Sequence, residues 1–456
     1  MISSTTEMNR TYQWQPQPAA WAWVMRMVER ACRVNGFLDE LSQRMQEQTG
    51  TRLVDWLDHI AVDRTDTDDA TLRQLGFVFN TGVNAWVHPG GLFPLVPRVT
   101  GRDTFPLRGL AIKVESVEDF AAAHGLAQQV EIVGEPGAAL RYAVVTPQAA
   151  LSCVVVERHG HSGWTIEAPT AAQLEMLGTV ARRFDDRTRP VRGCADAYAD
   201  AVARFDEVAA VVGRDRACDL FFAAERRYWE SRNHAARVQH DRQRQLGLGW
   251  ANHDHHTYRS SREHFAALVG TLEHMGFVCR ERFYAGAQAG WGAQVLEQKH
   301  CGLTVFADVD LSPDEVAGDF AHDGLAPRAE LGTVGVWCKL HGEAFLSAGL
   351  HHLECQFDFD LVQEQLQAAG VDTMAPFTDF SFLRQAFTAG EVWSIDAEHL
   401  AQLVREGALD AAQADEFARQ GARGSHLEIL ERNDGYKGFN QTGISEIIAR
   451  TDPRRG

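Results

Sequence analysis

The chain has 456 residues, 45% of them hydrophobic, and its 44 Lys and Arg against 62 Asp and Glu give a formal net charge of −18. This length and composition are typical of a globular protein with two or three modules and a large core. Nucleic acids and anionic membranes attract concentrated positive charge, so the acidic balance argues against both as partners. A small molecule is therefore the expected ligand.

The cysteines and the N-terminal residues indicate a soluble, cytoplasmic protein. The eight cysteines include no C-x-x-C pair, which argues against a zinc ribbon or a disulfide framework and fits a reducing compartment. The leader MISSTTEMNRTYQWQPQP lacks the apolar stretch of a signal peptide. We also find no run of about 18 apolar residues that could cross a membrane.

After this leader, the first expected elements are helices and then a strand. Residues 20–50 carry apolar side chains at three- and four-residue spacing, which predicts one or two amphipathic helices. Residues 57–64, LDHIAVDR, form a short strand pattern. The Thr and Asp residues that follow it offer N-cap chemistry for another helix.

The order of strand, acid-capped helix and several strands recurs along the chain. A second copy begins at residues 108–125 and a third at residues 250–277. Three β-α-β-β-β-like units form a weak internal repeat, detectable by pattern rather than by identity. Paired modules are the expected architecture.

These elements predict an α+β protein in six parts. Ala-, Arg- and Glu-rich stretches favour helices between the second and third copies. The predicted parts are an N-terminal helical segment (1–50), a first β-rich module region (51–165), a helical connector (166–247), a second, metal-binding module (248–311), a mixed α/β insertion (312–423) and a closing strand with its tail (424–456).

Histidine is the unusual residue type, with 19 copies and local clusters in NHDHHTYR and LHHLEC. His59 and His255 occupy matching places, each on a predicted strand that leads into a helix, so two equivalent strands could aim both imidazoles at one point. Two imidazoles and a carboxylate form the facial triad that suits non-haem Fe(II) and leaves positions open for substrate and O₂. The alternative is that His59 is a half-buried strand residue hydrogen-bonded to Asp58 or Asp63, and that NHDHHTYR is a polar loop.

Several segments of the second half resemble the iron-dependent 2-oxoadipate dioxygenase/decarboxylases, relatives of the vicinal-oxygen-chelate fold that make D-2-hydroxyglutarate in lysine breakdown. Residues 255–259 reproduce the H-x-T-x-R pattern of that family, with Asp254 in place of its Asn. VLEQKH (295–300) is similar to its glutamine strand and GSHLEILER (424–432) to its ligand strand. The resemblance implies that Gln298 is a site residue and that Glu428 is the metal-binding glutamate.

The match departs from the family pattern in two places. In that family an arginine follows the first ligand histidine by four residues. Here the fourth residue after His59 is Asp63, and Arg64 stands one further on. A long insertion also separates Gln298 from Glu428, which leaves other carboxylates open as the third ligand. These rivals are Glu354, Glu297 and Glu157.

Two arginines are candidates for reading the substrate. A 2-oxo diacid bound through its 2-oxo group and C1 carboxylate leaves a distal carboxylate, which Arg binds in bidentate fashion. Arg259 is the first candidate and Arg64 the second, and an ordinary surface ion pair is the alternative for each. Arg259 is an even number of residues from His255 on a predicted strand, so both side chains should share a face.

The resemblance implies paired vicinal-oxygen-chelate-type modules that form a curved, half-open barrel with added helices. It implies an Fe(II)-dependent enzyme that uses O₂ to convert a 2-oxo diacid such as 2-oxoadipate into CO₂ and a shortened 2-hydroxy acid. The sequence contains no P-loop, dinucleotide-binding or G-x-S-x-G motif. A metal-dependent isomerase, lyase or hydrolase, or a non-catalytic binding protein, remains the alternative, and assembly into a homo-oligomer is left open.

Overall fold

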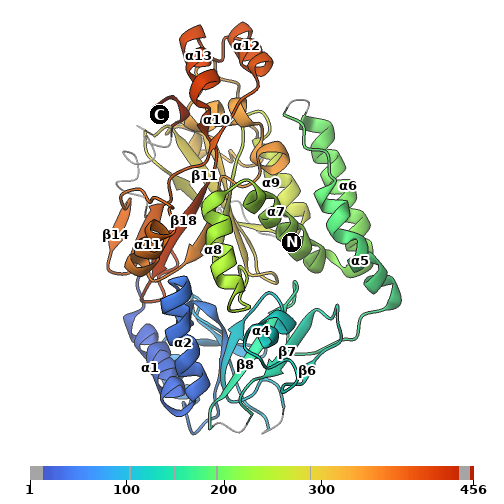
Figure 1. Ribbon diagram of the computed structural model, residues 1–456, viewed down its shortest axis with the longest axis vertical. Helices are drawn as coiled ribbons and strands as arrows, with labels where there is room; N and C mark the ends of the chain where they lie inside the picture. The colour runs from blue at the N-terminus through green and yellow to red at the C-terminus, as the bar shows by residue number, and fades with distance from the viewer. Residues whose placement is uncertain are drawn as a thin grey trace.

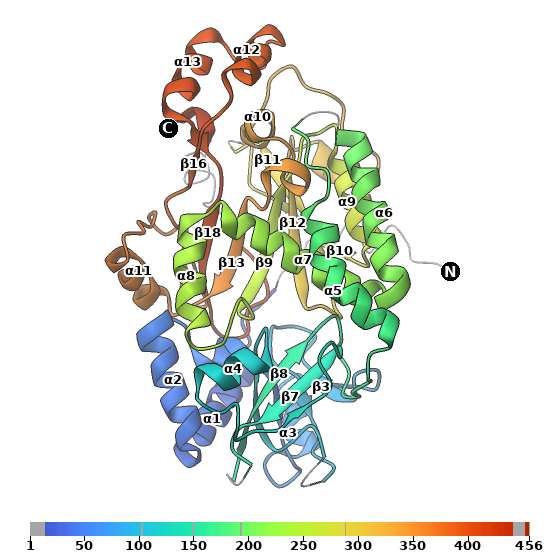
Figure 2. The same cartoon turned by 45° about the vertical axis from the view of Figure 1, so that its right-hand side comes forward.

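The computed structural model describes residues 14–101, 104–147, 150–191, 194–287, 289–440 and 452–455. It is an α+β structure with two main β-sheets, one from each half of the chain. Figures 1 and 2 show the first sheet and helices α1 and α2 at one end, and helices α12 and α13 at the opposite end. Within the described residues, no helix is both long enough and apolar enough to cross a lipid bilayer.

Helices α1 (Pro18–Val34) and α2 (Gly36–Thr49) confirm the predicted helical start. Proline suits the first turn of a helix because its fixed φ is helical and its missing N–H needs no partner there. The Asn35 side chain caps α2 by accepting from the Leu38 N–H at 3.3 Å. Gly50 then ends α2 in the left-handed conformation, with φ of 63°.

The first sheet has the order β1-β5-β8-β7-β6, and β1 also forms parallel bridges to the β2-β3-β4 sheet at His59–Leu95 and Val62–Arg98. Helices α3 (Asp69–Gln74) and α4 (Val117–Ala123) follow β1 and β5, so this half contains two β-α-β-β-β units. The strands are β1 (Leu57–Ala61), β2 (Val78–Asn80), β3 (Ala85–Val87), β4 (Val96–Pro97), β5 (Gly109–Lys113), β6 (Ile132–Val133), β7 (Leu140–Val144) and β8 (Ser152–Arg158).

Four helices connect the two sheets, as the Ala- and Arg-rich composition predicts. They are α5 (Ala171–Asp185), α6 (Cys194–Val212), α7 (Arg214–Ser231) and α8 (His234–Arg244). Their buried faces share one hydrophobic core with the second sheet, whereas α1, α2 and the first sheet share another. The helices therefore cover the sheet that carries the candidate site.

The second sheet has eight strands in the order β10-β11-β12-β9-β13-β18-β15-β14. Helix α9 (Phe265–His274) follows β9, and helix α11 (Phe359–Ala368) follows β13. The strands are β9 (His253–Arg259), β10 (Val278–Tyr284), β11 (Trp291–Gln298), β12 (Leu303–Asp310), β13 (His352–Gln356), β14 (Thr378–Phe380), β15 (Leu383–Phe387) and β18 (His426–Arg432).

This sheet consists of two β-α-β-β-β units placed back to back. In each unit the first strand pairs in parallel with the last, β9 with β12 and β13 with β18. The first strands of the two units, β9 and β13, pair antiparallel at the centre, where His256 is opposite Leu353. A twofold rotation about that pair would exchange His255 with His352, so these two histidines occupy equivalent places.

Part of the region predicted as an insertion, 312–423, belongs to this sheet. Strands β13, β14 and β15 lie within it, together with α11. The remainder forms helix α10 (Thr333–His341), helices α12 (Ala397–Arg405) and α13 (Ala411–Gln420), and the short strands β16 (Val392–Trp393) and β17 (Ala422–Arg423). Helices α12 and α13 lie between β15 and β18 in sequence, which hides the fourth unit from pattern reading.

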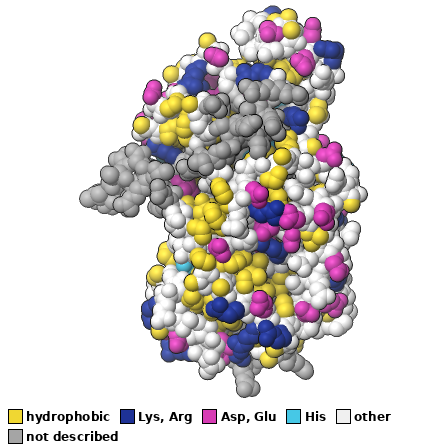
Figure 3. Space-filling view, turned by 90° about the vertical axis from the view of Figure 1, so that its left-hand side faces the viewer, with side chains coloured by type: hydrophobic (Ala, Val, Ile, Leu, Met, Phe, Trp, Pro, Cys, Tyr) yellow, Lys and Arg dark blue, Asp and Glu magenta, His cyan; other side chains and the backbone are white. Residues whose placement is uncertain are grey.

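The surface charge is mixed on the face seen in Figure 3. Lys and Arg side chains alternate there with Asp and Glu, and hydrophobic side chains are gathered between them. The described residues visible on this face form no continuous basic stripe of the kind that binds a phosphate backbone.

Candidate metal centre

Three neighbouring strands place two histidines and a glutamate on one face of the second sheet. His255 is on β9, His352 on β13 and Glu428 on β18. Alternate residues of a strand share a face, so Thr257 lies on the same side as His255, and Glu354 on the same side as His352. The pairing of Glu354 with both His255 and Glu428 fixes the register of the cluster.

The donor atoms of these three residues converge. One ligand atom from each of His255, His352 and Glu428 lies within 4.8 Å of the other two, and all three residues are buried. The Glu428 carboxylate is 2.8 Å from His352 Nε2 and 3.9 Å from His255 Nε2. His352 Nε2 also forms a 2.7 Å hydrogen bond with Thr257 Oγ1. This donor set matches the two-histidine, one-carboxylate arrangement typical of non-haem iron.

A second layer of polar groups orients the His255 ring. His255 Nδ1 contacts the carboxylate of Glu354 and lies 3.4 Å from that of Asp254. Arg432 holds Asp254 in turn through two 3.0 Å hydrogen bonds. A carboxylate on one ring nitrogen fixes the tautomer and leaves the other nitrogen free for a metal. Nε2 of His255 is thus the nitrogen directed toward Glu428.

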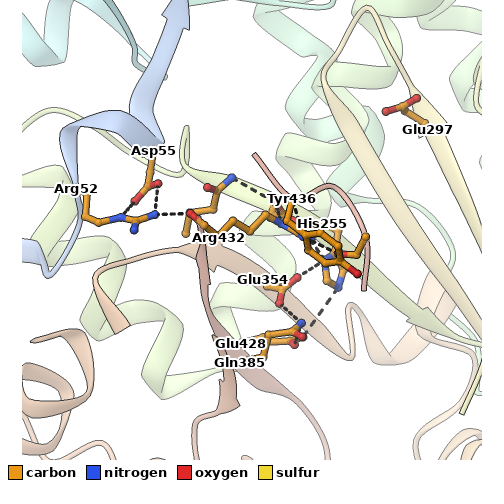
Figure 4. A network of polar contacts seen from close by, with 12 residues as sticks. Arg52, Asp55, His255, Glu297, Glu354, Gln385, Glu428, Arg432 and Tyr436 are labelled. Carbon is orange, nitrogen blue, oxygen red and sulfur yellow. Dashed lines mark hydrogen bonds and ion pairs between the residues drawn. The ribbon is translucent and has the colours of Figure 1, made fainter. Parts of the chain in front are cut away.

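The two glutamates and His352 are held in a similar way. Gln385 on β15 donates to Glu354 at 2.8 Å and to Glu428 at 3.3 Å. His352 Nδ1 is 2.9 Å from His351 Nδ1, so one of these nitrogens carries the hydrogen. Figure 4 shows the contacts that run from His255 through Glu354 to Gln385 and Glu428, with Glu297 well apart from them.

The charges of this cluster favour a divalent cation. Burial acts to lower the pKa of His255, but the Glu354 and Asp254 carboxylates raise it to about 9. Burial and the neighbouring Glu354 hold the pKa of Glu428 well above its ordinary range. Asp254 is paired with Arg432, whereas the ion pairs of Glu354 and Glu428 among the described residues are with histidines. Buried charges of this kind are normally paired or bound to a metal, and the residues present therefore fit a divalent ion.

The three residues line a cavity of about 60 Å³ whose remaining walls are largely aromatic. Phe306 and Phe439 pack against the His255 ring, with centroid distances of 4.5 and 5.6 Å. The other aromatic residues that line the cavity are Phe283, Trp291, Phe377 and Phe387. Such a lining excludes water and strengthens electrostatic interactions inside the site.

Two buried charged side chains lie further along the same strands. Asp308 lines the cavity, and it pairs in register with Arg259 on β9. Within the described residues, Arg259 Nε and Nη1 and Asp308 Oδ1 have no hydrogen-bond partner. Burial raises the pKa of Asp308 to about 7, although Arg259 and His255 act to lower it. An unpaired buried guanidinium is costly, which is a reason to expect an anionic or polar ligand beside it.

The structure brings together two of the three metal ligands predicted from the sequence. His255 and Glu428 meet at the cluster, but His59 lies on β1 of the first sheet. There, His59 Nδ1 is 2.6 Å from Asp58, and its ring packs against Phe105 and Trp164. The contact with Asp58 agrees with the alternative interpretation of His59, although the residue is fully buried and not half-buried. His352 lies in the third position near His255.

The other predicted site residues lie outside the cavity. Arg64 is 79% exposed and pairs with Asp69 at 3.6 Å. Gln298 donates to Asp215 and accepts from the backbone of the turn at residues 300–301. Arg259 shares a strand face with His255, as predicted, but among the described residues Asp308 lines the cavity and Arg259 does not.

The three rival carboxylates fall in different places. Glu297 pairs with Lys437 and Arg280, and Glu157 bonds to His159 and the Val117 N–H. Glu354 does contact His255, and with Asp254 it forms a second possible ligand group. That group is on the Nδ1 side of the ring, away from the cavity that His352 and Glu428 line.

Sequence reasoning missed His352, Gln385 and Asp308. His352 stands in LHHLEC, a histidine cluster that matches none of the family motifs. The available signal was a fourth strand-then-helix pattern, HLECQFDFDLVQEQL, in which a histidine opens the strand as in the third copy. Gln385 and Asp308 belong to no local motif. Strand pairing alone places Gln385 beside the two glutamates and Asp308 at the cavity.

The comparisons with known proteins give a low overall likeness. No family model matches the chain, and no curated protein matches it. A putative hydrolase from Shewanella frigidimarina is 15% identical, with 49% of this chain and 98% of that chain covered and a TM-score of 0.35. A triple mutant of 4-hydroxymandelate synthase from Streptomyces coelicolor is 12% identical, with 88% and 98% covered and a TM-score of 0.28.

Methylmalonyl-CoA epimerase from Mycobacterium tuberculosis is 12% identical, with 40% of this chain and 88% of that chain covered and a TM-score of 0.23. Likeness at this level carries no argument about the reaction. The case for function therefore rests on the site itself.

Proposed function

We propose that the protein is a metal-dependent enzyme, an Fe(II)-dependent dioxygenase/decarboxylase of a 2-oxo acid, with His255, His352 and Glu428 as its metal ligands. The observation that carries this proposal is the convergence of two imidazoles and one carboxylate at the wall of an aromatic cavity. When bound, the ion would supply Lewis acidity toward the 2-oxo carboxylate group and redox chemistry with O₂.

The ligand residues are preorganised by their own neighbours. Glu354 and Asp254 hold the Nδ1 side of His255, so Nε2 is presented without any rearrangement of the ring. Gln385 donates to Glu428 and thereby limits rotation of its carboxylate. A site held in this way keeps its geometry during reaction, which is the condition for electrostatic stabilisation.

The cavity walls would bind the apolar stem of the substrate and exclude water. The rings of Phe306 and Phe439 flank His255, and their centroids are 4.4 Å apart. Thr257 Oγ1 and Asp308 are the polar groups of the β9 and β12 walls, and either can hydrogen-bond to a bound oxo acid. The aromatic walls therefore orient the ligand, and the few polar groups select it.

We propose a 2-oxo diacid such as 2-oxoadipate as substrate, with a shortened 2-hydroxy acid such as D-2-hydroxyglutarate and CO₂ as products. Arg259 supports this choice, because its buried guanidinium has two nitrogens without a partner in the described chain. A distal carboxylate would satisfy them through a charge-assisted pair. The family resemblance of the segment 255–259 points to the same substrate class.

The test is turnover of protein purified anaerobically and loaded with Fe(II). O₂ uptake and CO₂ release would be followed over 2-oxo acids with and without a terminal carboxylate. Equal amounts of O₂ consumed and CO₂ released, with diacids preferred, would support the proposal. Turnover without O₂ consumption would instead favour an isomerase, lyase or hydrolase that uses the ion only as a Lewis acid.

A further inference from the structure

A second cluster of potential metal ligands lies on the outer side of the same sheet unit. It combines Glu273 in the last turn of α9, Cys279 at the start of β10 and His322 in the loop after β12. One ligand atom from each of the three lies within 4.8 Å of the others. Three segments that are separate in sequence therefore present a sulfur, a nitrogen and an oxygen at one point.

The contacts within the cluster all meet at the Glu273 carboxylate. Its Oε1 accepts from Cys279 Sγ at 3.7 Å and lies 3.2 Å from His322 Nε2. The side chains of Glu273 and His322 are 37% and 36% exposed, and Cys279 is half-buried. An ion could reach this point from solvent without opening the fold.

The His322 ring is oriented by a further carboxylate. Asp319 lies 2.9 Å from His322 Nδ1 through both of its oxygens, and Arg282 pairs with Asp319 at 3.3 Å. With Nδ1 bound to Asp319, Nε2 is the nitrogen that faces Glu273 and Cys279. Metal-bound histidines are typically held in this way, with a carboxylate on the second nitrogen.

The carboxylates of the cluster act on both of the other potential donors. Burial acts to lower the pKa of His322, but Asp319 and Glu273 raise it. Burial and Glu273 also raise the pKa of the Cys279 thiol to about 12. An ion that binds this sulfur as a thiolate would displace the thiol proton.

We propose that Glu273, Cys279 and His322 form a second metal site, selective for a borderline-soft divalent ion such as Zn²⁺. Thiolate, imidazole and carboxylate are the donors that zinc takes in proteins, with a fourth position left for water. The site differs from the centre at His255 in having a sulfur donor, so the two should differ in metal preference. A bound ion would link the α9–β10 junction to the loop that contains His322.

The sulfur donor provides the test. Metal-free protein would be titrated anaerobically with Co²⁺, and the near-ultraviolet charge-transfer band of cobalt thiolate would be followed. We expect the band in the wild-type protein and in Cys301→Ser, a change at a half-buried cysteine in the turn between β11 and β12, but not in Cys279→Ser. Zn²⁺ should abolish the band by competition for the same ligands.

The variant His322→Gln tests whether a loss of metal binding comes from the missing ligand and not from unfolding. It keeps a polar side chain at an exposed place, and we expect it to weaken Co²⁺ binding at this site by at least about tenfold. Circular dichroism would verify that each variant is folded. Absence of the band in wild-type protein, its survival in Cys279→Ser, or unchanged affinity in His322→Gln would each overturn the proposal. None of these results bears on the proposed iron chemistry, because the ligands at His255 include no sulfur.

Discussion

At the scale of single residues, the geometry of His255 depends on its carboxylate neighbour. Glu354 contacts Nδ1 and is itself held by Gln385. We predict that Glu354→Gln weakens metal affinity about 10- to 100-fold while a saturating concentration still loads the site, because the ring loses its fixed tautomer but no ligand. Metal titration checks this. Glu297→Gln is the matched control and should leave affinity unchanged, since Glu297 pairs with Lys437 and Arg280 and lies apart from the cluster.

Arg259 carries the second residue-scale prediction. Arg259→Ala should lower kcat/KM for a 2-oxo diacid. The expected loss of transition-state stabilisation is about 2–4 kcal/mol, as for loss of a buried charge pair, and the bound metal should stay intact. The same variant should have a smaller effect on a 2-oxo monoacid. Unchanged kinetics on the diacid would show that Arg259 does not bind the distal carboxylate. Asp308, which lines the cavity directly, would then be the next residue to test.

At the scale of elements, Gly50 ends α2 and packs against α11. Its φ is +63°, and a Cβ added there would lie 2.8 Å from the Val362 backbone. We predict that Gly50→Ala lowers the free energy of unfolding by about 2–3 kcal/mol, from left-handed strain and the collision. Gly36→Ala is the control: nothing lies within 4 Å of its added Cβ, so it should be neutral or stabilising by up to about 1 kcal/mol. Denaturant unfolding of both variants tests this, and equal effects would contradict it.

The sequence predicts the positions of helices and strands better than it predicts which strands pair. The N-terminal helices, the strand at His59 and the strand at His255 were placed from apolar spacing and caps. The fourth unit was not, because α12 and α13 separate β15 from β18 and obscure the repeat. Local patterns fix which residues form strands, whereas the partner of a strand depends on contacts between distant segments.

The same limit explains the candidate site. Equivalent strands can aim two histidines at one point, but the strand that pairs with β9 at the centre of its sheet is β13 and not β1. His59 lies within the first strand of a unit in the other half of the molecule. The sequence pattern therefore identifies histidines on the first strand of a unit. Only the order of strands in the sheet shows which two of these histidines lie close together.

At the scale of the whole molecule, His159 links the two halves. It follows β8, and its ring contacts Glu157 at 2.8 Å and Asp219 of α7 at 3.1 Å. Burial acts to lower its pKa, but the two carboxylates raise it from 6.5 to about 9. A raised pKa means that this stabilisation is complete below about pH 6.5 and is lost as the pH rises through about 9.

We therefore predict that His159→Gln destabilises the protein by about 1–2 kcal/mol below about pH 6.5, a value discounted for partial exposure. The difference between wild type and variant should shrink toward zero above about pH 9. Urea unfolding at both ends of this range measures it. A difference that grows with pH would show that the imidazolium is not the stabilising form.

The most direct measurement of the central claim is the metal content of His352→Ala and His59→Ala, each reconstituted anaerobically with Fe(II) beside wild-type protein. Loss of one of three ligands removes both a bond and the facial geometry, so His352→Ala should retain little or no metal at the site. His59→Ala should remain stoichiometric, because His59 lies on the first sheet against Asp58, Phe105 and Trp164. Stoichiometric iron in His352→Ala, or its loss in His59→Ala, would contradict the triad of His255, His352 and Glu428.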